Sequence, residues 1–263
     1  MQEIKNIKLF LFDMDGTLYL GDNLFPFTKK LLNVIKEKGN KYLFLTNNSA
    51  KSVKDYVIKL KKLGIEATED DFLTSSQATA FYLEKNFKNS NLYVCGTESL
   101  KAELKSQGFK ITEDLENVDC IVMGNDQELT FKKLEDVSKL LLTKKDIPYF
   151  ATNPDYVCPT EFGSVPDCGS ICDMLYNVSK RQPVFIGKPE PLMPKLAMEK
   201  VGVKPCETAV VGDRIYTDIK SGLNADAFTI LVLSGETDQA ILEASSDKPH
   251  LVLNDAGELL NMR

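Results

Sequence analysis

An apolar segment near the start of the chain, residues 7–12, ends abruptly in Asp13-Met14-Asp15-Gly16-Thr17. An apolar run of this length, bounded by acidic residues and glycine, predicts a buried strand of a parallel sheet. Open α/β sheets bind their ligands at the carboxyl ends of such strands. Asp13 and Asp15 are two residues apart, so near the strand end both carboxylates can turn toward one site. We therefore expect a functional site at the end of this first strand.

Short apolar segments alternate with amphipathic segments along the chain, as in a doubly wound parallel sheet with right-handed crossovers. This pattern stops and restarts, which predicts an α/β core formed by residues 1–76 and 182–263 and a smaller α/β domain inserted at 77–181. Residues 158–169 are rich in proline, glycine and acid, and we expect a loop there. Among the predicted elements are strands at 41–45, 72–74, 91–95, 120–123, 147–151, 208–211, 228–233 and 251–253, and helices at 27–38, 53–63, 76–86, 98–107, 130–143 and 170–179.

Composition restricts the partners and the chemistry of the chain. It has 263 residues, 43% of them hydrophobic, and a net charge of −6, which argues against nucleic acid and anionic membranes as partners. No apolar run approaches the roughly 18 residues that span a bilayer. The first strand begins too early to leave room for a secretory signal, so we expect a cytoplasmic protein.

The histidine and cysteine residues argue against several classes of site. His250 is the single histidine, which disfavours a Ser-His-Asp triad, a multi-histidine zinc site and a phosphohistidine mechanism, and we expect it to be structural. The six cysteines lack C-x-x-C spacing and are expected to be reduced. Cys168 and Cys172 share a helical face, where they suit either a metal or, more simply, apolar packing. The chemistry must therefore use carboxylates, hydroxyls, lysine and a hard cation.

Three further polar groups follow predicted strands or lie in adjoining loops: Thr46-Asn47-Asn48-Ser49, Gly187-Lys188-Pro189, and Gly212-Asp213-Arg214 with Asp218. Each has a simpler interpretation on its own, as a helix-capping turn, a surface turn and a solvated helix start. Together with the first motif they match one task, the transfer of a phosphoryl group. Carboxylates with a magnesium ion and a lysine can neutralise a phosphate dianion, so that a carboxylate can attack phosphorus.

The expected roles follow from the chemistry of each side chain. Asp13 is the predicted nucleophile that forms an aspartyl-phosphate, and Asp15 the acid and base for the leaving group and the water. The predicted magnesium ligands are Asp13, Asp15 and Asp213, with Asp218 supporting them without binding the ion. The predicted phosphate-binding residues are Thr46, Asn47, Lys188 and Arg214.

These four motifs resemble those of the haloacid dehalogenase (HAD) superfamily, and most closely its NagD-like phosphatases with a C2-type cap. The resemblance covers nearly the whole chain. It implies a Rossmann-like doubly wound core, an inserted cap domain, Mg²⁺, a nucleophilic first aspartate and small phosphomonoester substrates, such as nucleotides, sugar phosphates, phosphoglycolate, pyridoxal phosphate or 4-nitrophenyl phosphate. We expect a small phosphorylated metabolite as partner, and a homodimer is compatible with the sequence.

Specificity is expected to come from the inserted domain, because the core motifs contact only phosphate and metal. Thr152-Asn153-Pro154-Asp155 resembles a cap motif of the same group. The candidate residues are Asn153 and Asp155, together with Gly169 and Ser170 in the turn that opens the next helix. The alternative is that Asn153 and Asp155 only build a turn beside Pro154.

Several other functions share parts of this pattern. A receiver domain carries a phosphorylatable aspartate, but it is about half as long, and that aspartate does not lie on its first strand. A haloacid dehalogenase would need neither Asp15 nor the metal. A phosphomutase or phosphotransferase uses the same aspartyl-phosphate and differs only in the acceptor, so the sequence leaves it open.

Overall fold

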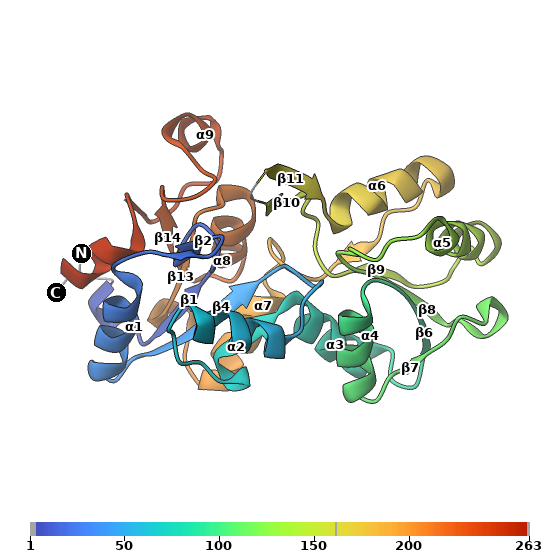
Figure 1. Cartoon of the computed structure of the whole chain (residues 1–263), viewed down its shortest axis with the longest axis horizontal. Coiled ribbons are helices and arrows are strands. Elements are labelled where there is room, and N and C mark those ends of the chain that lie inside the picture. Colours follow the sequence, from blue (N-terminus) through green and yellow to red (C-terminus); the bar gives the residue numbers. More distant parts are fainter. Residues whose placement is uncertain (1–3, 161, 262–263) are drawn as a thin grey trace. The chain divides into compact units, whose positions relative to one another are not determined.

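The computed structural model describes residues 4–160 and 162–261, and the chain divides into two compact units (Figure 1). The first unit contains Met1–Thr46, Tyr56–Leu73 and Lys188–Arg263, and the second contains Asn47–Asp55 and Thr74–Gly187. The insertion predicted at 77–181 falls inside the longer segment of the second unit. That unit also includes nine residues, Asn47–Asp55, that directly follow a strand of the first.

The first unit is built on a sheet whose described strands lie in the order β15-β14-β13-β1-β4-β5. β1 pairs in parallel with both β13 and β4, and β13, β14 and β15 continue in parallel on one side. The chain therefore leaves β1 in one direction and later returns on its other side, which makes β1 a switch point where ligands bind. The strands are β1 (Leu9–Phe12), β4 (Lys41–Thr46), β5 (Phe72–Thr74), β13 (Thr208–Gly212), β14 (Phe228–Val232) and β15 (Leu251–Leu253).

Helices with one apolar face follow these strands. In α1 the buried residues include Leu31, Leu32 and Ile35, at the spacing that gathers them on one side. Ser52 and Asp55 form a capping box at the start of α2, with the Ser52 amide 2.9 Å from Asp55 Oδ2. The α-helices are α1 (Thr28–Glu37), α2 (Val53–Lys62), α7 (Leu192–Val201), α8 (Lys220–Asn224) and α9 (Gln239–Ala244), with 3₁₀ helices at Ile4–Asn6, Glu69–Asp71, Pro205–Glu207 and Ala256–Asn261.

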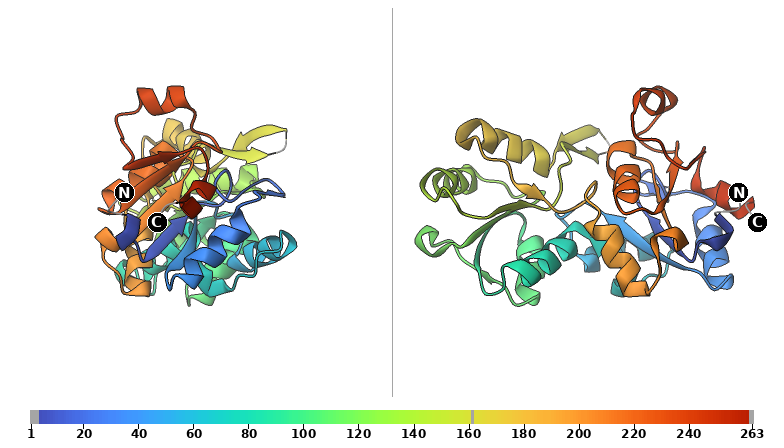
Figure 2. Two further views of the ribbon diagram at one scale, coloured as in Figure 1. Left: turned by 90° about the vertical axis from the view of Figure 1, so that its left-hand side faces the viewer. Right: turned by 180° about the vertical axis from the view of Figure 1, so that it is seen from behind.

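The second unit has its own parallel sheet, with described strands in the order β12-β9-β8-β6-β7. Helices α5 and α6 pack on one face of this sheet, and α3 and α4 lie on the other (Figure 2). The strands are β6 (Asn91–Cys95), β7 (Lys110–Ile111), β8 (Cys120–Met123), β9 (Tyr149–Ala151) and β12 (Val184–Phe185), and the helices are α3 (Ser75–Asn86), α4 (Glu98–Ser106), the 3₁₀ turn Leu115–Asn117, α5 (Phe131–Thr143) and α6 (Cys168–Ser179).

The structure corrects one local prediction. The segment expected as a loop at 158–169 contains an antiparallel hairpin, β10 (Val157–Thr160) with β11 (Gly163–Pro166). Most side chains of these strands are exposed, so no alternation of buried and exposed residues reveals the pairing in the sequence. A second short hairpin that was not predicted, β2 (Tyr19–Leu20) with β3 (Asn23–Leu24), follows the first motif.

The residues set aside as structural lie within the packing of the two units. Cys168 and Cys172 are fully buried in the apolar cluster under α5 and α6, and all six cysteines are free thiols. The ring of His250 stacks on Phe228, and its Nδ1 lies 2.8 Å from the Thr229 hydroxyl. In the part of the chain that the structure describes, no helix is both long and apolar enough to cross a membrane.

Candidate active site

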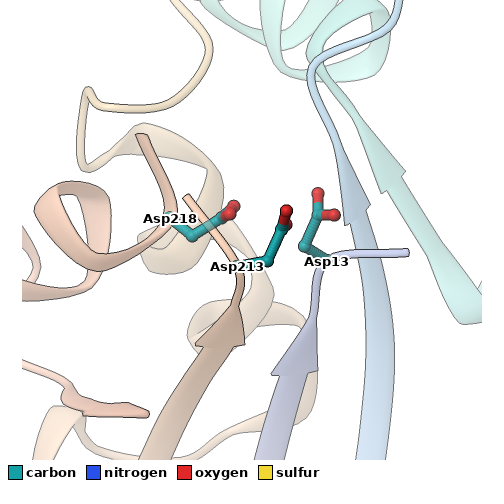
Figure 3. A group of neighbouring side chains, drawn as sticks. All are labelled: Asp13, Asp213 and Asp218. Atoms are coloured by element: carbon teal, nitrogen blue, oxygen red, sulfur yellow. The ribbon is translucent and has the colours of Figure 1, made fainter. Parts of the chain in front are cut away.

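Three carboxylates from the first unit meet at the carboxyl ends of β1 and β13. Asp13 follows β1, and its amide donates to the carbonyl of Val211 in β13 at 2.8 Å. Asp213 follows β13, and Asp218 lies in the π-helical turn Ile215–Ile219. One oxygen of each carboxylate lies within 4.8 Å of those of the other two, and Figure 3 shows the three side chains gathered at this point.

Lys188 bridges two members of this group, which is called the carboxylate cluster below. Its Nζ lies 2.7 Å from Asp13 Oδ1 and 2.5 Å from Asp218 Oδ1. Only 3% of the Lys188 side chain is exposed. When all four groups are ionised, three carboxylates and one ammonium leave two negative charges in a largely buried place.

Burial and the neighbouring carboxylates raise the pKa values of Asp13 and Asp213. The pKa of Asp13 rises to about 8, mainly because of burial; Lys188 opposes this rise, whereas Asp218 and Asp213 add to it. Burial and then Asp218 raise the pKa of Asp213 to about 7. Burial lowers the pKa of Lys188, but Asp13 and Asp218 raise it by more, so the ammonium form is favoured. The site thus has an excess of negative charge that its own lysine does not balance.

The donor atoms of the cluster fit a hard divalent cation. Asp213 Oδ2 accepts a hydrogen bond from the Glu236 amide at 2.7 Å, but its Oδ1 is buried and has no hydrogen-bond partner among the described residues. A buried, unpartnered carboxylate oxygen is costly unless a cation or water satisfies it. Mg²⁺ prefers carboxylate oxygens, and one such ion would balance the two surplus charges.

Glycines let the main chain approach the cluster closely. A Cβ added to Gly235 would lie 2.0 Å from Asp213 Oδ2, and one added to Gly16 would lie 2.4 Å from the same oxygen. The loop at 234–237 was not singled out from the sequence, although it holds Asp213 through Glu236 and Thr237. The sequence signal for this loop is the polar, glycine-containing segment Ser-Gly-Glu-Thr, which lies just after β14. That strand is the neighbour of β13 in the sheet.

Asp15 lies outside the carboxylate cluster. Its side chain is 41% exposed, and Lys59 Nζ lies 3.9 Å from its Oδ2. Lys59 also lies over the ring of Tyr19, 4.2 Å from its centroid. The cluster therefore contains two of the three predicted metal ligands, Asp13 and Asp213, together with Asp218, which was expected only to support them. The Asp15 carboxylate is not the third member.

Two further predicted phosphate-binding residues of the first unit have polar partners of their own. Arg214 pairs through Nε with Glu236 Oε2 at 2.7 Å. The Thr46 hydroxyl, at the end of β4, lies 3.5 Å from the Tyr56 hydroxyl. Their roles in binding phosphate stay predictions.

The predicted residues of the second unit form a buried hydrogen-bonded group. Asn153 is fully buried and Asp155 is 4% exposed; Asn153 Nδ2 lies 2.9 Å from Asp155 Oδ2 and 3.2 Å from Asp167 Oδ1. A Cβ on Gly169 would lie 2.2 Å from the Pro154 carbonyl oxygen. These contacts indicate that Asn153, Asp155 and Gly169 hold the segment after β9 against the start of α6. Their predicted role in specificity stays a prediction.

Ser170 differs from these residues because its side chain is not buried in the group. Its hydroxyl donates to the main-chain oxygen of Tyr156 at 2.6 Å, in an exposed contact. Asp167 is the N-cap residue of α6, and its Oδ1 accepts a hydrogen bond from the Cys168 amide. Ser170 is thus half-buried, whereas Asn153, Asp155 and Gly169 are buried.

Known proteins similar to this chain identify its family. Models of haloacid dehalogenase-like hydrolases match residues 10–110 and 185–259. The 5′-nucleotidase YutF of Bacillus subtilis is 35% identical over 246 residues, 94% of each chain. The acid sugar phosphatase of Staphylococcus saprophyticus is 34% identical and covers 98% of each chain.

Solved structures agree with this assignment. A 4-nitrophenylphosphatase from Thermotoga maritima superposes with a TM-score of 0.93 at 40% identity and covers 98% of both chains. NagD from E. coli K-12 superposes with a TM-score of 0.87 at 29% identity, covering 96% of this chain and 98% of its own. The chain therefore belongs to the haloacid dehalogenase superfamily of hydrolases, in its NagD-like subfamily.

Proposed function

We propose that this protein is a Mg²⁺-dependent phosphatase that hydrolyses small phosphomonoesters through an aspartyl-phosphate on Asp13. The observation that carries the proposal is the carboxylate cluster bridged by Lys188, with one Asp213 oxygen buried and unpartnered. The similar proteins named 5′-nucleotidase, acid sugar phosphatase and 4-nitrophenylphosphatase support the choice of substrate class. A cytoplasmic location and a homodimer are part of the same proposal.

The first half of the reaction uses the ionised carboxylate of Asp13. Its Oδ attacks phosphorus, the bond from phosphorus to the ester oxygen breaks, and Asp15 gives its proton to the departing alkoxide. Lys188 neutralises charge on the phosphoryl oxygens, and Thr46, Asn47 and Arg214 are proposed to hold them. Asp13 and Asp213, with Asp218 beside them, would hold a Mg²⁺ ion, which would supply positive charge that keeps Asp13 ionised and offsets the dianion.

The second half restores the enzyme. Asp15, now a carboxylate, takes a proton from water while the water oxygen attacks phosphorus. The bond between phosphorus and Asp13 breaks, and orthophosphate leaves. The exposed position of Asp15 outside the cluster suits this role, because the group must exchange a proton while Asp13 stays ionised.

We further propose that the inserted segment 77–181 selects the substrate. The groups of the first unit recognise phosphate and metal, which every phosphomonoester complex shares. Discrimination between leaving groups therefore needs contacts from elsewhere in the chain. Ser170 is the candidate for such a contact, because it is half-buried whereas Asn153, Asp155 and Gly169 are buried.

A substrate screen tests the proposed function. Release of orthophosphate from nucleoside monophosphates, sugar phosphates, phosphoglycolate, pyridoxal phosphate and 4-nitrophenyl phosphate would be measured with Mg²⁺ and with EDTA. We expect hydrolysis of several of these, on the order of 10³-fold or more faster with Mg²⁺. Adding an alcohol acceptor separates a phosphotransferase, which would release less orthophosphate than leaving group. Absence of both products from every substrate would contradict the proposal.

Gly235→Ala should lower kcat by roughly 10- to 100-fold, the cost of misplacing a catalytic group by about an ångström. The added Cβ would lie 2.0 Å from Asp213 Oδ2, so the carboxylate must shift. Gly257→Ala is the matched control, since its Cβ would lie 2.7 Å from Phe27 Cγ, away from the cluster, and neither glycine has a positive φ. Equal kcat values in the two variants would show that the Gly235 contact does not hold Asp213 for the reaction.

A further inference from the structure

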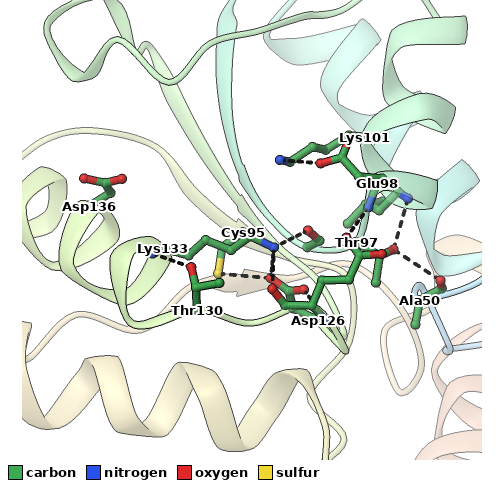
Figure 4. A network of polar contacts seen from close by, with 12 residues as sticks. Ala50, Cys95, Thr97, Glu98, Lys101, Asp126, Thr130, Lys133 and Asp136 are labelled. Carbon is green, nitrogen blue, oxygen red and sulfur yellow. Dashed lines mark hydrogen bonds and ion pairs between the residues drawn. The ribbon is translucent and has the colours of Figure 1, made fainter.

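The loop that follows β4 belongs to the second unit and is hydrogen-bonded to other segments of that unit. The Ser49 hydroxyl lies 2.8 Å from the Thr152 hydroxyl and accepts from the Asn125 amide at 2.9 Å. The Thr97 hydroxyl donates to the Ala50 carbonyl at 3.2 Å, a contact drawn in Figure 4, and the Ser75 hydroxyl donates to the Asn47 carbonyl at 2.7 Å. The partners come from the ends of β6, β8 and β9 and the start of α3, so this loop belongs to that sheet's carboxyl edge.

Asn47, the first residue of this loop, is held by its side chain as well. Its Nδ2 donates to Asp155 Oδ2 at 2.7 Å, and Asn153 Nδ2 donates to the same oxygen at 2.9 Å. The main-chain carbonyl and the side chain of Asn47 are thus both hydrogen-bonded, which restricts the orientation of its main chain. A hydrogen bond to a carboxylate is stronger than one between neutral groups. Asp155 is only 4% exposed, so little water competes for this oxygen.

The space around Asn47 is also filled. A Cβ on Gly187 would lie 2.6 Å from Asn47 Oδ1 and 2.5 Å from the Thr152 carbonyl oxygen. Gly187 immediately precedes Lys188, and Asn47 immediately follows Thr46. Asn47 and Gly187 both belong to the second unit, and each is the sequence neighbour of a proposed phosphate-binding residue of the first.

We propose that Asp155 is a positioning residue for phosphate binding, acting through Asn47, and not a residue that selects the leaving group. The inference rests on the proposed function, in which the Thr46–Asn47 segment binds the phosphoryl oxygens. By this account the second unit sets the affinity for the phosphoryl group, which is common to every substrate. Loss of a specificity residue would change the ranking of substrates. Loss of Asp155 is expected instead to weaken the binding of all phosphomonoesters by the same factor.

Asp155→Ala should raise KM by about tenfold for each substrate and raise the inhibition constant of orthophosphate by the same factor, the scale of a lost hydrogen bond to a charged group. At saturation kcat should change by less than about threefold, since Asp13, Asp15 and Lys188 are intact. Asp155→Asn keeps one carbonyl oxygen as acceptor, so it should recover part of the lost affinity. A merely structural role would not produce this separation of KM from kcat.

Tyr93→Phe is the matched control within the second unit. It removes a buried hydrogen bond of 3.1 Å, from the Tyr93 hydroxyl to Asp136 Oδ2, at a place in the α5 packing remote in sequence from the loop. It should lower the unfolding temperature without changing KM or the inhibition constant of orthophosphate. If Asp155→Ala does not fold, Asp155→Asn supplies the same comparison.

Binding of orthophosphate in the presence of Mg²⁺, followed by calorimetry, separates this inference from the proposed function. A wild-type protein that binds orthophosphate but hydrolyses no ester would refute the phosphatase and leave the positioning role testable by the tenfold loss in the variants. If the protein hydrolyses esters and the inhibition constant of orthophosphate is unchanged in both Asp155 variants, the positioning role alone is overturned. A change in the ranking of substrates without a common loss of affinity would also overturn it. Absence of both hydrolysis and binding would overturn both proposals.

Discussion

Asp13→Asn should lower kcat for 4-nitrophenyl phosphate by roughly 10³- to 10⁶-fold, the range seen when an enzyme loses its nucleophile. The amide keeps the shape of the side chain but removes the attacking charge and one oxygen of the carboxylate cluster. Because no covalent intermediate can form, single-turnover experiments should show no phosphoenzyme with any ester. A variant that retained a tenth of the wild-type turnover would exclude Asp13 as the nucleophile.

The same variant should not be less stable than the wild type when metal is absent. The pKa of Asp13 is raised from 3.8 to about 8 in the folded protein, chiefly by burial, so the folded state favours the neutral carboxyl. Stability is then lost as the pH rises through that interval, and above it the wild type carries the full cost of the buried charge. Asp13→Asn avoids this cost, while Lys188 keeps Asp218 as a partner.

Thermal unfolding in EDTA above about pH 8 measures this difference. We expect the unfolding temperature of Asp13→Asn to equal or exceed that of the wild type, whereas its activity is lost. A large fall in the unfolding temperature would mean that the lost turnover reflects damage to the fold. The comparison thereby separates a chemical role for Asp13 from a structural one.

Removal of Mg²⁺ should abolish turnover, with a loss on the order of 10³-fold or more that added Mg²⁺ reverses. Without the ion, burial raises the pKa of Asp13 to about 8, so near neutral pH this side chain is mostly a neutral carboxyl group that cannot attack phosphorus. Ca²⁺ should support activity poorly, because it takes more and looser oxygen ligands and would misplace Asp13 relative to phosphorus. Full activity in chelator would point to the metal-independent chemistry of the dehalogenases.

Mg²⁺ binding should also release protons and strengthen as the pH rises. In the metal-free protein the pKa values of Asp213 and Asp13 are raised to about 7 and about 8, so both carry protons at and below these values. The ion binds the ionised forms, so its apparent affinity should increase from about pH 6 to about pH 8 and level off above that. Calorimetry in two buffers of different ionisation enthalpy counts the protons. An affinity independent of pH, with no proton release, would contradict this assignment of the ligands.

The sequence by itself determined the family, the α/β fold and the strand ends that carry the site. Apolar runs such as residues 9–12 and 120–123 match observed strands because burial of a parallel strand on both faces leaves a local signal. Asp13 and Asp213 directly follow β1 and β13, so the parallel pairing of these two strands brings both aspartates to the same edge of the sheet. The hairpin at β10 and β11 left no such signal, because its side chains are mostly exposed and its stability comes from main-chain hydrogen bonds.

Only the tertiary structure decided which side chains meet. It placed Asp218 in the carboxylate cluster and left the Asp15 carboxylate outside it, whereas the sequence predicts Asp15 as a metal ligand and Asp218 as a supporting residue. It joined Asn47 to Asp155, 108 residues apart, and assigned the loop after β4 to the second unit. Spacing along the chain fixes which face of an element a residue occupies. A hydrogen bond between distant segments depends instead on how separate elements pack, and no local pattern records that distance.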